Sequence, residues 1–181
     1  GQEGKYSGFA IYVPENQYSN AKGSKSVAQY VYDRLTKLYP QSNLPIEDEG
    51  IVEDQELIAI GSNNTLDGAG MLIEYGYIYE SAFFEKELRE TAISDLALQT
   101  YLGVLDFFGQ KPAASAVSEH ETAYVPHVWE KDLERGIEAD PDVLRLQAAL
   151  ALEGVYPPPG EDKNDCPLTG SFGNCTKRSV K

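Results

Sequence analysis

The chain is poor in the residues that most often build metal and nucleophile sites. Its 181 residues include two cysteines, two histidines, one methionine and one tryptophan. Two cysteines are too few for a zinc site of four thiolates, and two histidines are too few for a catalytic site of three. The sequence also has no Gly-x-Ser-x-Gly nucleophile elbow and no glycine-rich phosphate loop. These absences exclude several common enzyme classes.

Positive charge is scarce as well. Fifteen lysines and arginines stand against 29 aspartates and glutamates, which gives a formal net charge of −14. Such an acidic surface repels a phosphate backbone, so we expect no nucleic acid partner. No apolar run approaches the roughly 20 residues of a membrane-spanning helix, so we expect no membrane insertion. Hydrophobic residues make up 41% of the chain, enough to build a packed core.

The two ends of the chain suggest a piece of a longer protein. The only methionine is Met71, so Gly1 is not a translation start, and no signal-like segment follows it. At the other end, residues 176–181 have the pattern of the first turns of a helix. We therefore expect that some functional groups lie outside this chain.

Hydrophobic patterning predicts an α/β fold, a sheet with flanking helices. Short apolar runs predict buried strands at 8–14, 57–61 and 70–76. Apolar residues spaced three and four apart predict helices over 24–39 and 84–108. The expected buried stripes are Val27, Val31, Leu35 and Leu38 in the first helix, and Leu88, Ala92, Ile93, Leu96, Ala97, Tyr101, Val104, Leu105 and Phe108 in the second.

The composition changes after Gly109 and divides the chain. We predict a first domain over 1–110, a Pro/Ala/Ser-rich linker over 111–126, and a small, mainly helical unit over 127–181. A helix in this last unit should begin at the Asp140-Pro141 pair and end at Gly154. Its expected buried stripe is Val143, Leu146 and Leu150.

Glu74 is the leading candidate for a catalytic side chain. It ends an apolar strand, where a carboxylate is costly to bury without a partner. The carboxyl ends of strands in open α/β sheets are also where ligands bind. The alternative is a carboxylate held in a salt bridge or on the rim of the fold. By contrast, the acidic segment 46–50 reads as a solvated loop.

The histidines and cysteines allow more than one interpretation. His120 and Glu121 begin like a metalloprotease motif, but Tyr124 stands where the second histidine belongs, so solvated roles are favoured for His120 and His127. Cys166 and Cys175 bracket a turn-rich segment. They could form a disulfide in an oxidising compartment or remain two half-buried thiols.

Three tyrosines after the last predicted strand alternate with other residues. If the chain stays extended, Tyr75, Tyr77 and Tyr79 point to one side. They would then form either a surface on which sugar rings stack or ordinary core and rim packing.

The segment from Gly70 to Ile78 resembles the signature of zinc-dependent N-acetylmuramoyl-L-alanine amidases: an apolar strand, Glu, any residue, Gly, an aromatic and an aliphatic residue. The resemblance covers about residues 6–109, the C-terminal part of the catalytic domain. It implies that Glu74 acts on a zinc-bound water and on the developing oxyanion. It also implies that the zinc ligands, His, Glu and His, precede Gly1. We therefore expect zinc in the full-length protein and no metal ligand in this chain.

Two departures from the family pattern keep other hypotheses open. Tyr79 and Glu80 stand where the family has Ser-Asn, and an arginine expected near Gly61 is missing. These departures favour a non-catalytic cell-wall-binding protein with a degenerate amidase fold. A third hypothesis is a glycosidase that uses Glu74 and Glu80 as its carboxylate pair.

The C-terminal segment 127–181 resembles the start of a small three-helix peptidoglycan-binding domain. The residues that carry this resemblance are Asp132, Leu133, Gly136, Val143, Leu146, Gln147, Leu150, Gly154, Thr169, Gly170, Ser171, Phe172, Gly173 and Thr176. Both resemblances imply peptidoglycan as the partner. Together they predict a secreted or cell-envelope hydrolase that cleaves the amide bond between N-acetylmuramic acid and L-alanine.

Overall fold

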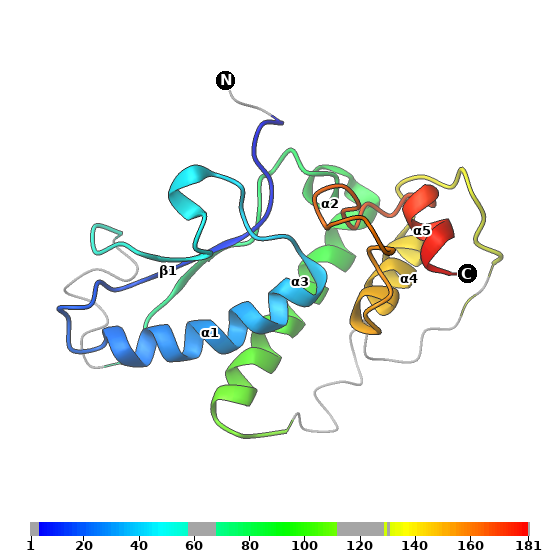
Figure 1. Cartoon of the computed structure of the whole chain (residues 1–181). Helices are drawn as coiled ribbons and strands as arrows, with labels where there is room; N and C mark the ends of the chain where they lie inside the picture. The colour runs from blue at the N-terminus through cyan, green and yellow to red at the C-terminus, as the bar shows by residue number, and fades with distance from the viewer. Residues whose placement is uncertain (1–3, 58–67, 112–128, 130, 181) are drawn as a thin grey trace. The chain divides into compact units, whose positions relative to one another are not determined.

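A computed structural model describes residues 4–57, 68–111, 129 and 131–180 (Figure 1). Its contacts divide the chain into two compact units. Unit 1 comprises 1–36, 41–77 and 99–111, and unit 2 comprises 37–40, 78–98 and 112–181. The predicted linker lies almost entirely outside the described residues, so the predicted domain boundaries stay predictions.

Unit 1 is built on a small mixed sheet. The central strand β1 (Ala10–Val13) pairs in parallel with β2 (Ile51–Glu53) and antiparallel with β3 (Leu72–Glu74), which gives the order β2-β1-β3. This arrangement confirms a general α/β fold. The predicted strand at 57–61 lies outside the described residues apart from Leu57, whereas the sequence pattern did not predict β2.

The strand that ends at Glu74 differs from its prediction in two respects. Consecutive apolar residues suggested a strand covered on both faces, but Leu72 and Ile73 are only half-buried. Because β3 is antiparallel to β1, its carboxyl end lies at the opposite edge from the carboxyl ends of β1 and β2. The rule that ligands bind at the carboxyl ends of parallel strands therefore does not support a ligand site at Glu74.

The first predicted helix is confirmed as α1 (Ala21–Leu38), which runs alongside the sheet (Figure 1). Its predicted stripe is buried, and the hydroxyl of Ser24 accepts a hydrogen bond from the backbone N–H of Gly70 at 2.9 Å. The helix α3 (Lys86–Phe107) follows a short α2 (Ser81–Phe84). α3 approaches α1 so closely at Gly103 that an added Cβ would lie 2.6 Å from the Cα of Val31.

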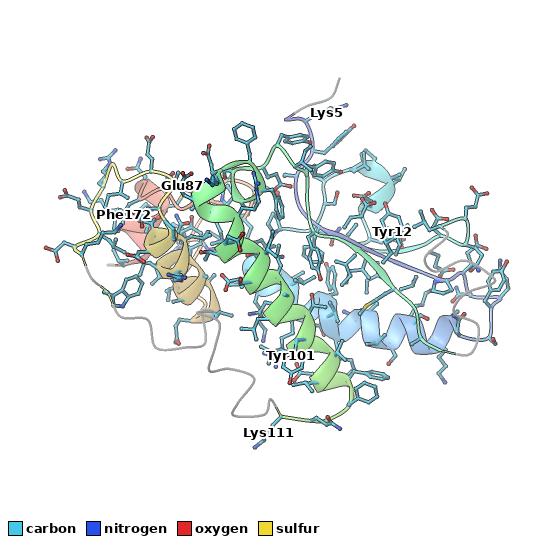
Figure 2. The ribbon with its side chains drawn as sticks, turned by 180° about the vertical axis from the view of Figure 1, so that it is seen from behind. Lys5, Tyr12, Glu87, Tyr101, Lys111 and Phe172 are labelled. Atoms are coloured by element: carbon cyan, nitrogen blue, oxygen red, sulfur yellow. A yellow bond between two sulfur atoms is a disulfide. The ribbon has the colours of Figure 1, made fainter. Side chains whose placement is uncertain are left out.

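The long helix α3 forms as predicted, but only part of its predicted stripe is buried. Leu88, Ala92 and Leu96 are buried, whereas Ile93, Ala97, Tyr101 and Phe108 are exposed (Tyr101 is labelled in Figure 2). Thr91, Asp95 and Gln99 are buried in their place. Apolar residues occur all round this helix, so a spacing of three and four selects no single face.

In unit 2, the predicted helix start is confirmed. The side chain of Asp140 accepts hydrogen bonds from the backbone N–H groups of Asp142 and Val143, at 2.9 and 3.3 Å, and caps α4 (Pro141–Leu152). Gly154, with φ of +74°, follows the last turn. The stripe is rotated from its prediction: Leu146 and Leu150 are half-buried, and the buried residues are Val143, Leu144, Gln147, Ala148 and Ala151.

A disulfide closes the C-terminal part of unit 2. Cys166 and Cys175 are bonded, with their Cα atoms 5.9 Å apart, which decides between the two interpretations of this pair. Cys175 lies in the short helix α5 (Asn174–Ser179). Of the helices that the structure describes, none has the length and apolar character that a membrane crossing requires.

Candidate functional site

Glu74 is the last residue of β3 and lies opposite Ala10 of β1. Residues directly opposite each other on antiparallel strands point to the same face of a sheet. Tyr12 lies opposite Leu72, two residues along, and therefore shares this face as a diagonal neighbour of Glu74. Glu74 itself is exposed. The strand register thus sets an accessible carboxylate beside a buried phenol.

The phenol of Tyr12 holds a second carboxylate on this face. Its hydroxyl donates a hydrogen bond to Oε1 of Glu47 at 2.5 Å. Both side chains are buried, with exposed fractions of 8% for Tyr12 and 3% for Glu47. The prediction of a solvated loop at 46–50 is therefore wrong at Glu47. Sequence reasoning missed this residue, because nothing in the local acidic pattern shows which carboxylate turns inward.

Glu47 is buried because its loop is anchored to β1 at both of its ends. The backbone N–H of Ser42 donates to the carbonyl of Phe9 at 2.8 Å, and the N–H of Ile11 donates to the carbonyl of Gly50 at 2.9 Å. Between these anchors, Pro45–Glu47 forms a 3₁₀ turn that opens on a proline. Pro45 was the only local feature of the sequence that could have predicted a turn here.

A second set of contacts fixes the end of the same loop. The hydroxyl of Tyr32 donates to Oε1 of Gln41 at 2.6 Å. Gly50 has φ of +71°, and an added Cβ would lie 2.4 Å from the ring of Tyr32. The loop is thus held against α1 as well as against β1, so Glu47 has a defined position.

The electrostatics of the cluster follow from this packing. Partial burial, and then the negative charge of Glu47, raise the pKa of the Glu74 carboxyl above its ordinary value. Burial, and then the hydrogen bond to Glu47, raise the pKa of Tyr12 well above the usual range of a phenol, with smaller contributions from Glu74 and Tyr77. Two carboxylates and the phenol of Tyr12 therefore form one electrostatic cluster (Tyr12 is labelled in Figure 2).

Glu53 provides a comparison, because it is the carboxylate that ends β2. It forms an ion pair with Lys25 and accepts hydrogen bonds from the backbone and side chain of Asn16. The hydrogen bond from Lys25, above all, lowers the pKa of Glu53. Among the residues that the structure describes, Glu74 makes no ion pair. A salt bridge therefore describes Glu53 and not Glu74. The exposed position of Glu74 fits the other half of the alternative, a carboxylate on the rim of the fold.

The alternating tyrosines do not share one side. The chain leaves its extended path at Gly76, which has φ of +152°. The hydroxyl of Tyr75 lies 2.8 Å from that of Thr100 on α3, whereas the ring of Tyr77 lies 6.4 Å from that of Tyr6. Of the three alternating tyrosines, Tyr77 is the one that contributes to the raised pKa of Tyr12.

No zinc site can be built from the residues described. Within 4–57, 68–111, 129 and 131–180, no three His, Cys, Asp or Glu side chains are grouped to hold a metal ion. His120 and His127 lie outside these ranges. The side chains present do not fit the histidine-rich ligand set that the amidase resemblance implies. Upstream zinc ligands stay a prediction.

Neither a protein-family model nor a curated protein matches this chain. The case for a function therefore rests on the local arrangement around Glu74 and on the sequence resemblances.

Proposed function

We propose that the chain belongs to a peptidoglycan hydrolase that cleaves the amide bond between N-acetylmuramic acid and L-alanine, with Glu74 as its catalytic acid–base. The supporting observation is the state of Glu74: an exposed carboxyl with a raised pKa and no ion pair among the described residues, at the end of the strand that carries the amidase-like segment. A carboxyl whose pKa lies closer to the working pH transfers protons more effectively in both directions. Fold resemblance alone would be a weaker argument.

Amide hydrolysis needs a group that takes a proton from the attacking water and returns one to the departing amine. An exposed carboxylate can reach both positions, and the negative charge of Glu47 strengthens its affinity for the proton that it has to carry. We propose zinc as the cofactor, held by ligands in a segment that precedes Gly1. When bound, it would supply Lewis-acid chemistry at the scissile bond.

Unit 2 supports the same substrate from a different part of the sequence. Its residues 127–181 resemble a peptidoglycan-binding domain, and a binding unit joined to a catalytic unit raises the local concentration of a polymeric substrate. The disulfide between Cys166 and Cys175 favours an oxidising compartment. We therefore propose a secreted or cell-envelope location.

The test is Glu74→Gln in a protein that includes the upstream segment. Glutamine keeps the size of the side chain but cannot accept a proton. Turnover of peptidoglycan should fall by about 10²–10⁴-fold, the usual contribution of a positioned acid–base group. Zinc content and peptidoglycan binding should be unchanged, since neither depends on proton transfer.

Glu53→Gln is the matched control, since Glu53 also ends a strand but is paired with Lys25. It should keep turnover within about threefold of the unchanged protein. If Glu74→Gln also stays within about threefold with zinc bound, Glu74 is not the acid–base group.

The second candidate function is a cell-wall-binding protein without catalysis. Tyr79 and Glu80, at the position of the family's Ser-Asn pair, favour it. In that case the intact protein would sediment with insoluble peptidoglycan and release no L-alanine amino termini. Amide cleavage by the intact protein would exclude this function.

A further inference from the structure

We propose that Glu47 is a positioning residue for Glu74: it places a fixed, buried negative charge on the sheet face that carries Glu74. The inference rests on the proposed acid–base role of Glu74. It adds a second carboxylate and its phenol anchor to a site in which the sequence singled out only one residue.

The first support is the fixed position of Glu47. Its loop is held to β1 by a backbone hydrogen bond at each end, donated by the N–H of Ser42 at the start and by the N–H of Ile11 at the end, and its carboxylate is held by Tyr12. A charge on such an anchored loop cannot swing away into water when the site fills. Its effect on a neighbour is therefore constant.

The second support is the chemistry of the anchor. Because the pKa of Tyr12 is raised well above that of a free phenol, its hydroxyl keeps its proton throughout the neutral range. It therefore remains a donor, and Glu47 remains an acceptor. The hydrogen bond from Tyr12 therefore holds the carboxyl of Glu47 in place across this range.

The third support is the geometry of the neighbours. Glu47, from the 3₁₀ turn, is the charged group that acts on Glu74, and Glu47, Glu74 and Tyr77 act on Tyr12 of β1. None of them carries a positive charge. The negative charge of Glu47 therefore acts on Glu74 without a neutralising partner in this set, and Glu74 holds its proton to higher pH.

A structural role alone would make a different prediction. If Tyr12 and Glu47 only pin the loop, removing the charge of Glu47 changes stability and leaves the titration of Glu74 where it is. If Glu47 acts as proposed, the titration of Glu74 moves even in a variant that folds normally. The pH at which Glu74 titrates therefore separates the two roles.

The experiment is a ¹³C NMR titration of the Glu74 carboxyl in the 181-residue chain and in Glu47→Gln. Glutamine keeps an oxygen that can accept from Tyr12 but carries no charge. Glu74 should titrate at lower pH in this variant, and the acid limb of the pH profile of peptidoglycan cleavage by the intact enzyme should move in the same direction. Glu53→Gln, on the far strand, should move neither.

An unmoved Glu74 titration in folded Glu47→Gln would overturn the proposal. If that variant does not fold, Tyr12→Phe provides the test. It removes the hydroxyl that donates to Glu47 and so weakens the effect of that carboxylate. The pH at which Glu74 titrates should then fall, by less than in Glu47→Gln. No shift in Tyr12→Phe overturns the proposal too. Because the titration needs no turnover, a shift of Glu74 together with no amide cleavage by the intact protein that includes the upstream segment supports the partnership and rejects the amidase. If the intact protein cleaves peptidoglycan and the acid limb of its pH profile does not move in Glu47→Gln, the amidase is supported and the partnership of Glu47 with Glu74 is rejected.

Discussion

Each unit buries both an amide and a carboxylate: Gln99 and Glu47 in unit 1, and Gln147 and Asp95 in unit 2. Gln147 and Glu47, one from each unit, make the clearest comparison. Gln147 is a neutral amide with an exposed fraction of 1%, and Glu47 is a carboxylate with an exposed fraction of 3% whose charge acts on a second carboxylate, Glu74. Both are held by hydrogen bonds, so burial and hydrogen bonding alone do not separate a structural group from a functional one.

What separates them is how completely each group is satisfied. The Oε1 atom of Gln147 accepts from the backbone N–H groups of Thr169 and Gly170, each at 3.0 Å. Its Nε2 atom donates to the carbonyl of Ser171 at 3.0 Å and to the hydroxyl of Thr176 at 2.9 Å. All the donors and acceptors of the amide are used. Nothing remains with which this group could bind or react.

In unit 1, the repulsion between the carboxylates of Glu47 and Glu74 is not compensated by an ion pair of Glu74 among the described residues. Glu47 accepts from Tyr12, but its charge also raises the pKa of Glu74 and makes the ionised form of that exposed carboxyl less favourable. An unfavourable charge at an accessible position is a property of acid–base sites, whereas a neutral satisfied amide is a property of a core. The comparison supports a structural role for Gln147 and agrees with the acid–base role that we propose for Glu74.

The largest expected effect on stability comes from breaking the Gln147 network. Gln147→Met keeps the volume of the side chain and leaves the buried partners of Gln147 without hydrogen bonds. The free energy of unfolding of unit 2 should fall by about 2–4 kcal/mol. Hydrogen exchange of the amides of α4 measures this loss.

Gln29→Met is the matched control, because Gln29 is an exposed helical glutamine that bonds only to Asp33 among the described contacts. It should cost less than about 0.5 kcal/mol. If Gln147→Met costs no more than Gln29→Met, the contrast between the two units fails.

A smaller effect should follow loss of the disulfide. Cys166 and Cys175 are nine residues apart, and closing so short a loop is worth roughly 2–3 kcal/mol. Replacing both by serine should lower the melting temperature of unit 2 and leave the NMR signals of Tyr12 and Glu47 unchanged. A reductant should affect the original chain and have no effect on the double variant. A shift of the unit 1 signals would show that the units are coupled.

The parts of this fold that could be predicted from sequence depend on local signals. The cap at Asp140 needs only the two N–H groups that follow it, and the stripe of α1 needs only a regular spacing. The amidase-like segment is equally local, nine residues from Gly70 to Ile78, and the role that it implies for Glu74 stays a proposal. In each case the chemistry is contained within a few turns or one strand.

The features that sequence missed depend on contacts between distant segments. Tyr12 and Glu47 are 35 residues apart, and Glu47 is buried only because its loop bonds to β1. The buried face of α3 was only partly predicted because its apolar residues surround the helix. The disulfide had to be left open, since nothing in the spacing of Cys166 and Cys175 excluded two thiols.

The smallest effect, and the sharpest comparison, is the pH dependence of the two carboxylates that end strands. The pKa of Glu74 is raised in the folded state, so the folded chain binds this proton more tightly than the unfolded chain. Stability from this group is present at low pH and is lost as the pH rises through the folded pKa. The pKa of Glu53 is lowered by Lys25, so its contribution is present above the unfolded pKa and is lost on acidification.

Urea unfolding at pH 4 and pH 7 measures the change in the free energy of unfolding that each variant causes relative to the original chain. Between pH 4 and pH 7 this change should become more favourable for Glu74→Gln and less favourable for Glu53→Gln. Both changes should be small, because both side chains are partly in water. The same sign for both variants would mean that the pKa of Glu74 is not raised in the folded chain, and the contrast between the two strand ends would be lost.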